Sequence, residues 1–194
     1  MTRVNPNFAD TTNKILAWAE ARNLVKGATA IDQYMKLSSE VGELADAIAK
    51  KDEAGIKDGI GDAFVVLTIM SAQTNSVDAL MSASGHILPT FAAEISAKES
   101  FISLNDKIGQ LGSTIVESKN RLEHDGRYVA SDIKASIKRL MYLSSHFGLT
   151  LEECAASAYE EIKNRKGVMF NGTFVKSTDS RYEDVMAQIE ALKV

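Results

Sequence analysis

Cysteine is almost absent from this sequence, which has one, Cys154, among 194 residues. A single cysteine excludes a disulfide within the chain and fits a reducing compartment. We interpret Cys154 as a side chain of the hydrophobic core. Long apolar runs are missing as well, because no stretch approaches the roughly 20 residues that cross a bilayer and the first residues are polar. We therefore expect a soluble, cytoplasmic protein with no membrane partner.

The sequence also lacks an excess of positive charge. Its formal net charge is −4 at pH 7 and its isoelectric point is near 5.5. Such a chain has no basic footprint for nucleic acid or for an anionic membrane, so we expect no nucleic-acid partner. Any chemistry on phosphate groups has to depend on a few local side chains.

Proline is scarce too, with only Pro6 and Pro89, and the alternating apolar runs of strands are nearly absent. Both features favour an all-α protein. Apolar periodicity predicts helices over about 8–24, 30–50 and 56–74. A short turn joins the last two, which we expect to fold as an antiparallel helical hairpin.

The middle of the chain, about 76–147, has a different character. Two more amphipathic segments lie there, separated by a break at His124-Asp125-Gly126, and they predict a second helical hairpin. It carries no acidic constellation of its own, and its apolar stripes need a partner. We expect it to pack beside the first hairpin or to build an oligomer interface, within a single all-α domain over 1–194.

Local signals are strong after residue 148. Thr150 and Glu153 form a capping box at the start of a helix, and Gly167 is expected to cap its end. The stretch VMFNGTFVK has an Asn-Gly pair between apolar flanks, which predicts a small β-hairpin or an ordered extended tail. A further capping-box pattern predicts a last short helix from Ser180 to about 193.

Four carboxylates lie on the two helices of the first hairpin: Glu40, Glu43, Asp58 and Asp62. The helix of Asp62 is apolar nearly all round, and an isolated carboxylate in such surroundings is costly unless it is protonated, paired or bound to a metal ion. If the helices pair antiparallel, the four side chains converge, and hard oxygen ligands suit Mg²⁺ or Mn²⁺. The alternative is that Glu40 and Glu43 are ordinary solvated helix residues.

Candidate ligand-binding side chains surround this acidic group. Gln33 and Lys36 continue the polar strip of Glu40 and Glu43, so Lys36 is a candidate for phosphates and Gln33 for a nucleobase. Trp18 is either a core residue or a platform on which a nucleobase stacks. No GxSxG, HExxH, P-loop or CxxC motif is present, and no histidine follows a glutamate by three residues. Acyl transfer, zinc hydrolysis, Walker-type phosphoryl transfer and di-iron chemistry therefore lack support.

Three stretches resemble the MazG-like all-α nucleoside triphosphate pyrophosphohydrolases, especially the small forms of phages. They are QYMKLSSEVGELADAI, IKDGIGDAFVVLTIM and GLTLEECAASAYEEIKNRKGVMFNGTFVK, together under half of the chain. The resemblance implies a helical bundle of that type with an inserted hairpin at about 76–147, between catalytic segments at about 8–75 and 148–176.

The resemblance assigns metal binding to Glu40, Glu43 and Asp62. The family's second motif, E-x-x-D, would place a glutamate where this chain has Gly59; Asp58, on the same face, can substitute sterically. The family's basic element corresponds to Lys163 and Lys166, with Arg165 more to the other side. The alternative is that this basic cluster only complements the helix dipole.

The implied activity is Mg²⁺- or Mn²⁺-dependent hydrolysis of a (deoxy)nucleoside triphosphate to the monophosphate and pyrophosphate, with Glu40 or Glu43 accepting the proton of water. The substrate would be a purine nucleotide such as dGTP, and the enzyme a homodimer or homotetramer. A dUTP-specific or phosphoribosyl-ATP pyrophosphohydrolase is the alternative within this class. A non-catalytic helical nucleotide-binding or interaction module is the alternative outside it, and Gly59 favours that view.

Overall fold

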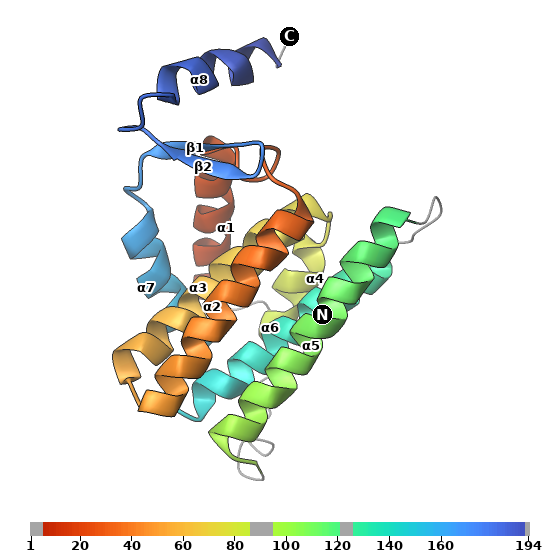
Figure 1. The fold of residues 1–194 in the computed structure, drawn as a ribbon. Coiled ribbons are helices and arrows are strands. Elements are labelled where there is room, and N and C mark those ends of the chain that lie inside the picture. The colour runs from red at the N-terminus through yellow and green to blue at the C-terminus, as the bar shows by residue number, and fades with distance from the viewer. Residues whose placement is uncertain (1–5, 86–94, 121–125, 193–194) are drawn as a thin grey trace.

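The computed structural model describes residues 6–85, 95–120 and 126–192, and it confirms the all-α prediction (Figure 1). In chain order the elements are α1 (Pro6–Ala21), α2 (Ala30–Lys50), α3 (Glu53–Gln73), α4 (Val77–Met81), the 3-10 turn η1 (Ser82–Gly85), α5 (Ala97–Asn120), α6 (Arg127–Ser145), α7 (Leu151–Ile162), β1 (Gly167–Phe170), β2 (Thr173–Lys176) and α8 (Tyr182–Ala191). Among the described residues, no helix combines the length and the apolar character needed to cross a membrane.

The predicted hairpin of α2 and α3 is present, and its ends are set by caps. Thr29 and Asp32 form a capping box at the start of α2, and Lys51 ends that helix in the left-handed region at φ 56°. Asp52 then caps α3 by accepting a hydrogen bond from the Gly55 N–H at 3.1 Å. The helix therefore begins at Glu53, earlier than predicted, and the turn is very short.

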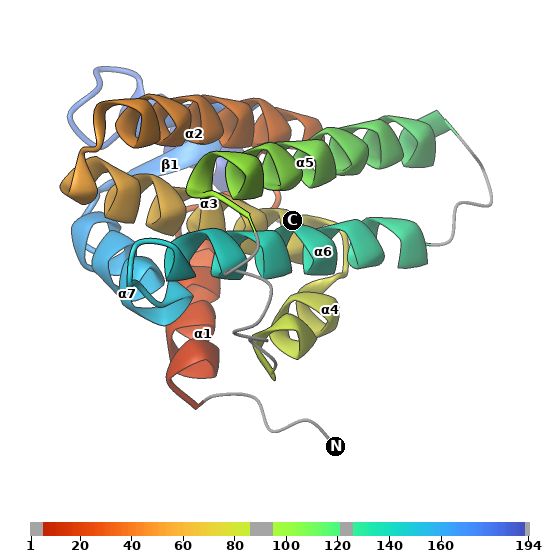
Figure 2. The ribbon, with the colours of Figure 1, turned by 90° about the horizontal axis from the view of Figure 1, so that it is seen from below.

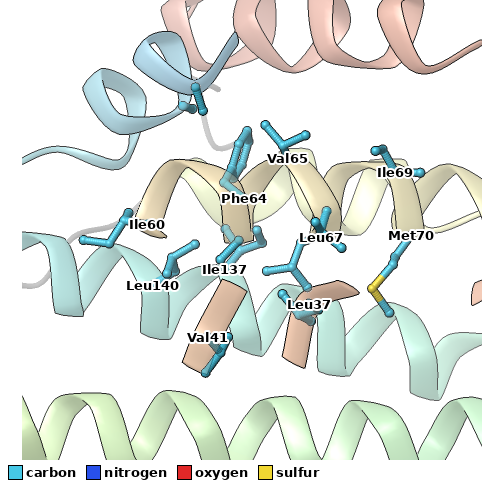
Figure 3. Close-up of a cluster of buried hydrophobic side chains, with 14 of the residues drawn as sticks. Leu37, Val41, Ile60, Phe64, Val65, Leu67, Ile69, Met70, Ile137 and Leu140 are labelled. Atoms are coloured by element: carbon cyan, nitrogen blue, oxygen red, sulfur yellow. The ribbon is translucent and has the colours of Figure 1, made fainter. Parts of the chain in front are cut away.

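Helix α3 is the centre of the bundle. It packs against α1, α2, α6 and α7, and its residues from Ala63 to Ser71 are all buried. Figure 3 shows Leu37 of α2 and Ile137 of α6 near the α3 side chains that form this core. Cys154 of α7 is also buried, which confirms its assignment to the core. Because α3 is buried along most of its length, a polar residue on this helix has largely apolar surroundings.

The second hairpin, α5 and α6, packs beside the first (Figure 2). Helix α6 lies against α3 and α5 against α2, where the Tyr34 ring sits over Gly112 so closely that a β-carbon there would come within 2.4 Å of it. Thr114 of α5 donates a hydrogen bond to Asp132 of α6 at 2.6 Å. The predicted break before α6 falls largely on residues 121–125, which lie outside the described residues.

In the C-terminal part of the chain, the structure confirms two of the sequence predictions and corrects two others. The capping box of Thr150 and Glu153 starts α7, and β1 and β2 pair antiparallel around the Asn-Gly turn. Gly167 is not the cap of α7, which ends at Ile162; it is the first residue of β1. Ser180 does not cap α8, which begins at Tyr182 without a side-chain cap.

The β-hairpin is attached to the connection between α1 and α2. The Met169 N–H donates to the Arg22 carbonyl and the Gly172 N–H to the Gly27 carbonyl, both at 2.8 Å. On its other face, Val185 and Ile189 of α8 form a small separate apolar cluster with Val168 and Val175 of the strands. The hairpin and α8 thus cover one end of the bundle, above α1 (Figure 1).

Candidate active site

A cavity of about 510 Å³ lies where α1, α2 and α3 meet the end of α7 and the β-hairpin. Its polar lining comprises Asp32, Gln33, Lys36, Glu40, Glu43, Asp62 and Arg165. Its apolar lining comprises Trp18, Leu24, Val65, Val66, Ile69, Ile162, Met169 and Phe174. The volume is within the range of small-molecule sites, about 300–1,000 Å³. One cavity therefore joins an acidic wall to an apolar and aromatic one.

The acidic wall begins on α2. Gln33, Lys36, Glu40 and Glu43 follow one another at helical spacing, so they share the side of α2 that faces the cavity. The Glu40 residue is only 4% exposed, and its carboxylate pairs with the Lys36 ammonium. Glu43 is exposed and accepts a hydrogen bond from Ser39 at 3.3 Å. Glu40 is thus the buried carboxylate of this wall, held by a cation one turn away.

Asp62 of α3 faces the α2 carboxylates and is half-buried. The pKa of Asp62 is raised from 3.8 to about 6, mainly by burial and in addition by the negative charges of Glu40 and Asp58. Lys36 and Arg165 act in the opposite direction. A carboxylate in this state favours binding of a cation, because a cation removes the cost of its charge.

Asp58 lies one turn before Asp62 but is exposed and does not line the cavity. Partial burial raises its pKa, and the nearby Glu161 and Glu43 raise it further. Gly59 faces Leu44 of α2, where an added β-carbon would come within 3.0 Å of the Leu44 β-carbon. The helices are therefore in tight contact at the position where the family motif would place its glutamate. The role of Asp58 as its substitute stays a prediction. Glu161 of α7 is an acidic neighbour that the sequence pattern did not indicate.

The carboxylates are near one another without forming a complete metal-ligand set. In the described part of the chain, no three His, Cys, Asp or Glu side chains are grouped closely enough to hold a metal ion as they stand. Yet the charges of Glu40 and Asp58 raise the pKa of Asp62, and the charge of Glu43 raises the pKa of Asp58. The donors are all carboxylate oxygens, which is the set that Mg²⁺ or Mn²⁺ prefers. The donor chemistry fits these ions, and their binding stays a prediction.

Arg165 is the basic residue of the C-terminal segment that lines the cavity. Helix α7 ends at Ile162, so the helical spacing that placed Arg165 opposite Lys163 and Lys166 does not apply beyond that point. Lys163 instead pairs with Glu160 at the surface, and Lys166 is exposed. Neither lysine lines the cavity, and their predicted role in phosphate binding is untested.

The apolar wall is suited to a flat, partly polar group. Trp18 is half-buried, and the Arg22 guanidinium lies over its ring, 4.9 Å from the ring centre. Gln33 is only 4% exposed, and the Trp18 Nε1–H is buried with no hydrogen-bond partner among the described residues. A buried N–H without a protein partner is costly unless a ligand or water satisfies it. Met169 and Phe174 of the β-hairpin complete this wall.

The two acidic helices also carry the decisive sequence similarity. Residues 30–83 match the MazG nucleotide pyrophosphohydrolase domain. The MazG resemblance seen in the sequence is thereby confirmed for α2, α3 and the residues just after them, and it supports nucleotide pyrophosphohydrolase activity in general.

One phage protein is similar to part of the chain. The uncharacterized 18.2 kDa protein in the rep-hol intergenic region of Haemophilus phage HP1 (strain HP1c1) is 47% identical over 64 residues. The match covers 33% of this chain and 39% of the phage protein, so the chain spans well under half of the relative's length. No solved structure matches the chain.

Proposed function

We propose that this protein hydrolyses a nucleoside triphosphate to the monophosphate and pyrophosphate with Mg²⁺ or Mn²⁺. The observation that carries the proposal is the single cavity in which Glu40, Glu43 and Asp62 face Arg165 and adjoin a wall of Trp18 and apolar side chains. A triphosphate needs cations and metal-binding carboxylates, whereas a nucleobase needs an apolar surface with a few polar groups. Side chains of both kinds line this one cavity, which supports the proposal.

The side chains of the cavity have different roles in the proposed reaction. Glu40, Glu43, Asp62 and Asp58 would hold the divalent ion, which when bound would neutralise charge at the phosphates and acidify water. Glu40 or Glu43 accepts a proton from the attacking water, whose oxygen bonds to the α-phosphorus while the bond to the bridging oxygen breaks. Arg165 and Lys36 stabilise the pyrophosphate that leaves, with Lys163 and Lys166 as additional candidates.

Product analysis tests this proposal directly. We expect pyrophosphate, in an amount equal to the monophosphate, from at least one member of a panel containing dGTP, dUTP, other triphosphates and phosphoribosyl-ATP. Release should require Mg²⁺ or Mn²⁺ and be lost in a Glu43→Gln variant. Orthophosphate with a diphosphate would refute the pyrophosphohydrolase mechanism, and no turnover of any substrate would favour a non-catalytic nucleotide-binding module instead.

The panel also separates the substrate classes. A purine nucleotide such as dGTP is our first candidate, and preference for dUTP or phosphoribosyl-ATP would identify the alternatives within this class. The homodimer or homotetramer implied by the family resemblance is a separate proposal, which light scattering of the purified protein would test.

The place of Gln33 in the cavity lining predicts a role in base selection. Replacing Gln33 by Leu removes one hydrogen bond to the base, which is worth roughly 0.5–1.5 kcal/mol. We expect the ratio of kcat/KM between the best and second-best triphosphates to fall roughly three- to tenfold, without a change in the Mg²⁺ requirement. Gln188→Leu, on the exposed face of α8, is the matched control. An unchanged ratio in Gln33→Leu would remove Gln33 from base recognition.

A further inference from the structure

Arg22 connects α1 to the turn that follows α7. Its Nε donates a hydrogen bond to the Arg165 carbonyl at 2.7 Å, and its two terminal nitrogens donate to the carbonyls of Lys163 at 3.1 Å and Trp18 at 3.2 Å. Its guanidinium also lies over the Trp18 ring. One side chain therefore holds two elements that are more than 140 positions apart in the sequence.

These contacts satisfy backbone carbonyls at the end of α7 and just after it. The last carbonyls of a helix have no partner within it, and a cation near that end is favourable. Helix α7 ends at Ile162, and the chain then turns through residues 163–165 towards β1. Arg22 satisfies two carbonyls of this turn, while the Arg165 N–H donates to the Ile162 carbonyl at 2.8 Å. The backbone of Arg165 is thus fixed by both its own N–H and its own carbonyl.

The side chain of Arg165 acts in the cavity. It lines the same space as Asp62 and Glu40, and its charge lowers the pKa of both Asp62 and Asp58. Arg165 is largely exposed and has no salt bridge to a described residue, so its own side-chain contacts do not fix its direction. What sets its position is the backbone turn that Arg22 holds.

We propose that Arg22 is a positioning residue that holds the 163–165 turn so that Arg165 faces the phosphates of the substrate. This inference rests on the proposed function. The guanidinium suits the role because its planar fork can donate to two carbonyls at once, whereas a lysine ammonium lacks that fixed geometry. Arg22 itself does not line the cavity, so it acts through Arg165 and not on the substrate.

A double-mutant cycle on Arg22 and Arg165 tests the coupling. In an otherwise wild-type protein, we expect Arg22→Ala to raise KM for the triphosphate about tenfold, with a smaller change in kcat, and to weaken inhibition by pyrophosphate by a similar factor. In an Arg165→Ala background the same replacement should have little further effect. Arg22→Lys should lie between wild type and Arg22→Ala.

Controls separate positioning from a general loss of structure. Lys14→Ala removes a cation of α1 that pairs with Asp10 at the surface, and it should leave KM unchanged. A KM increase for Arg22→Ala that persists in the Arg165→Ala background would overturn the proposal, because Arg22 would then act through Trp18 or the fold. If Arg22→Ala does not fold, an unchanged KM in Arg22→Lys would overturn it equally. Absence of pyrophosphate release by the wild type would refute the proposed function, and this inference with it.

Discussion

Without a divalent metal ion, the Asp62→Asn variant is expected to melt at pH 7 at a temperature equal to or above that of the wild type, although it has lost most of its activity. The half-buried Asp62 carboxylate costs stability at this pH, because burial and the charges of Glu40 and Asp58 oppose its ionisation. Asparagine keeps the shape of the side chain and removes the charge. It also removes one strong metal ligand, and we expect pyrophosphate release to fall at least about a hundredfold.

The pH dependence of this difference follows from the pKa of Asp62. Its ordinary value is 3.8 and its value in the folded protein is about 6. Between these values the folded state binds more protons than the unfolded state, so the wild type gains stability as the pH falls from 6 towards 3.8. Above pH 6 that gain is lost. The shift corresponds to about 3 kcal/mol, which solvent screening of a half-exposed group reduces to about 1–2 kcal/mol.

Melts in EDTA at pH 7 and pH 4.5 measure this effect. The advantage of Asp62→Asn should be present in full at pH 7 and fall to about a third of that value at pH 4.5. Added Mg²⁺ should raise the melting temperature of the wild type at pH 7, since a ligand at a hundred times its Kd stabilises by about 2.7 kcal/mol. The variant should lose most of that response.

Asp46→Asn is the matched control, because Asp46 pairs with Lys50 on the exposed side of α2 and lies outside the cavity. It should change neither the melting curve nor the activity by much. A fully active Asp62→Asn protein would show that Asp62 is not a metal ligand. A variant that fails to fold in EDTA would instead show that its carboxylate is mainly structural.

Elements with strong local signals were predictable from the sequence. Helix α2 runs over the predicted 30–50, because Thr29 and Asp32 cap its start and its apolar stripe has a clean helical period. The start of α7 followed from the capping box of Thr150 and Glu153, and the hairpin from the Asn-Gly pair. In each case the deciding interaction joins residues within a few positions of one another.

The predictions that failed concern ends without such a local contact. Glycine is the residue type expected at a helix C-cap, but α7 ends before Gly167. Beyond the end of the helix, the carbonyls of Lys163 and Arg165 accept hydrogen bonds from Arg22, which is distant in the sequence. The pattern of Ser180 and Glu183 also resembles a cap, yet α8 begins where its apolar residues pack on the β-hairpin. Tertiary contacts decided both ends.

The same distinction applies to the site. Glu40 and Asp62 could be placed because each belongs to a long helix whose apolar face the sequence reveals. The place of Arg165 in the cavity could not be predicted, since its direction depends on a turn that Arg22 holds. The contribution of the β-hairpin could not be predicted either, because the hairpin is attached through backbone hydrogen bonds at Met169 and Gly172. Backbone contacts of this kind leave no pattern of residue types in the sequence.

The close approach of α3 and α7 leads to the last prediction, a large loss of stability in Gly61→Val. A β-carbon on Gly61 would lie 2.5 Å from the Cys154 carbonyl oxygen and 2.9 Å from the Ala158 β-carbon, so α7 would have to move away from the central helix. Overpacking of a tight core costs about 1–3 kcal/mol, and a backbone contact with a branched side chain belongs at the upper end. The gain in helix propensity on replacing glycine by valine is only about 0.3–0.5 kcal/mol and does not compensate for it.

We expect Gly61→Val to melt about 6–12 °C below the wild type, because 1 kcal/mol shifts the melting temperature of a protein of this size by roughly 2–4 °C. Gly109→Val makes the same replacement in α5, where nothing lies within 4 Å of the added β-carbon, and should melt at or slightly above the wild-type temperature. Displacement of α7 also moves the turn that carries Arg165, so Gly61→Val should raise KM for the triphosphate whereas Gly109→Val should not. Equal melting temperatures for the two variants would contradict the tight contact between α3 and α7, and with it the rigid link from the central helix to the phosphate end of the cavity.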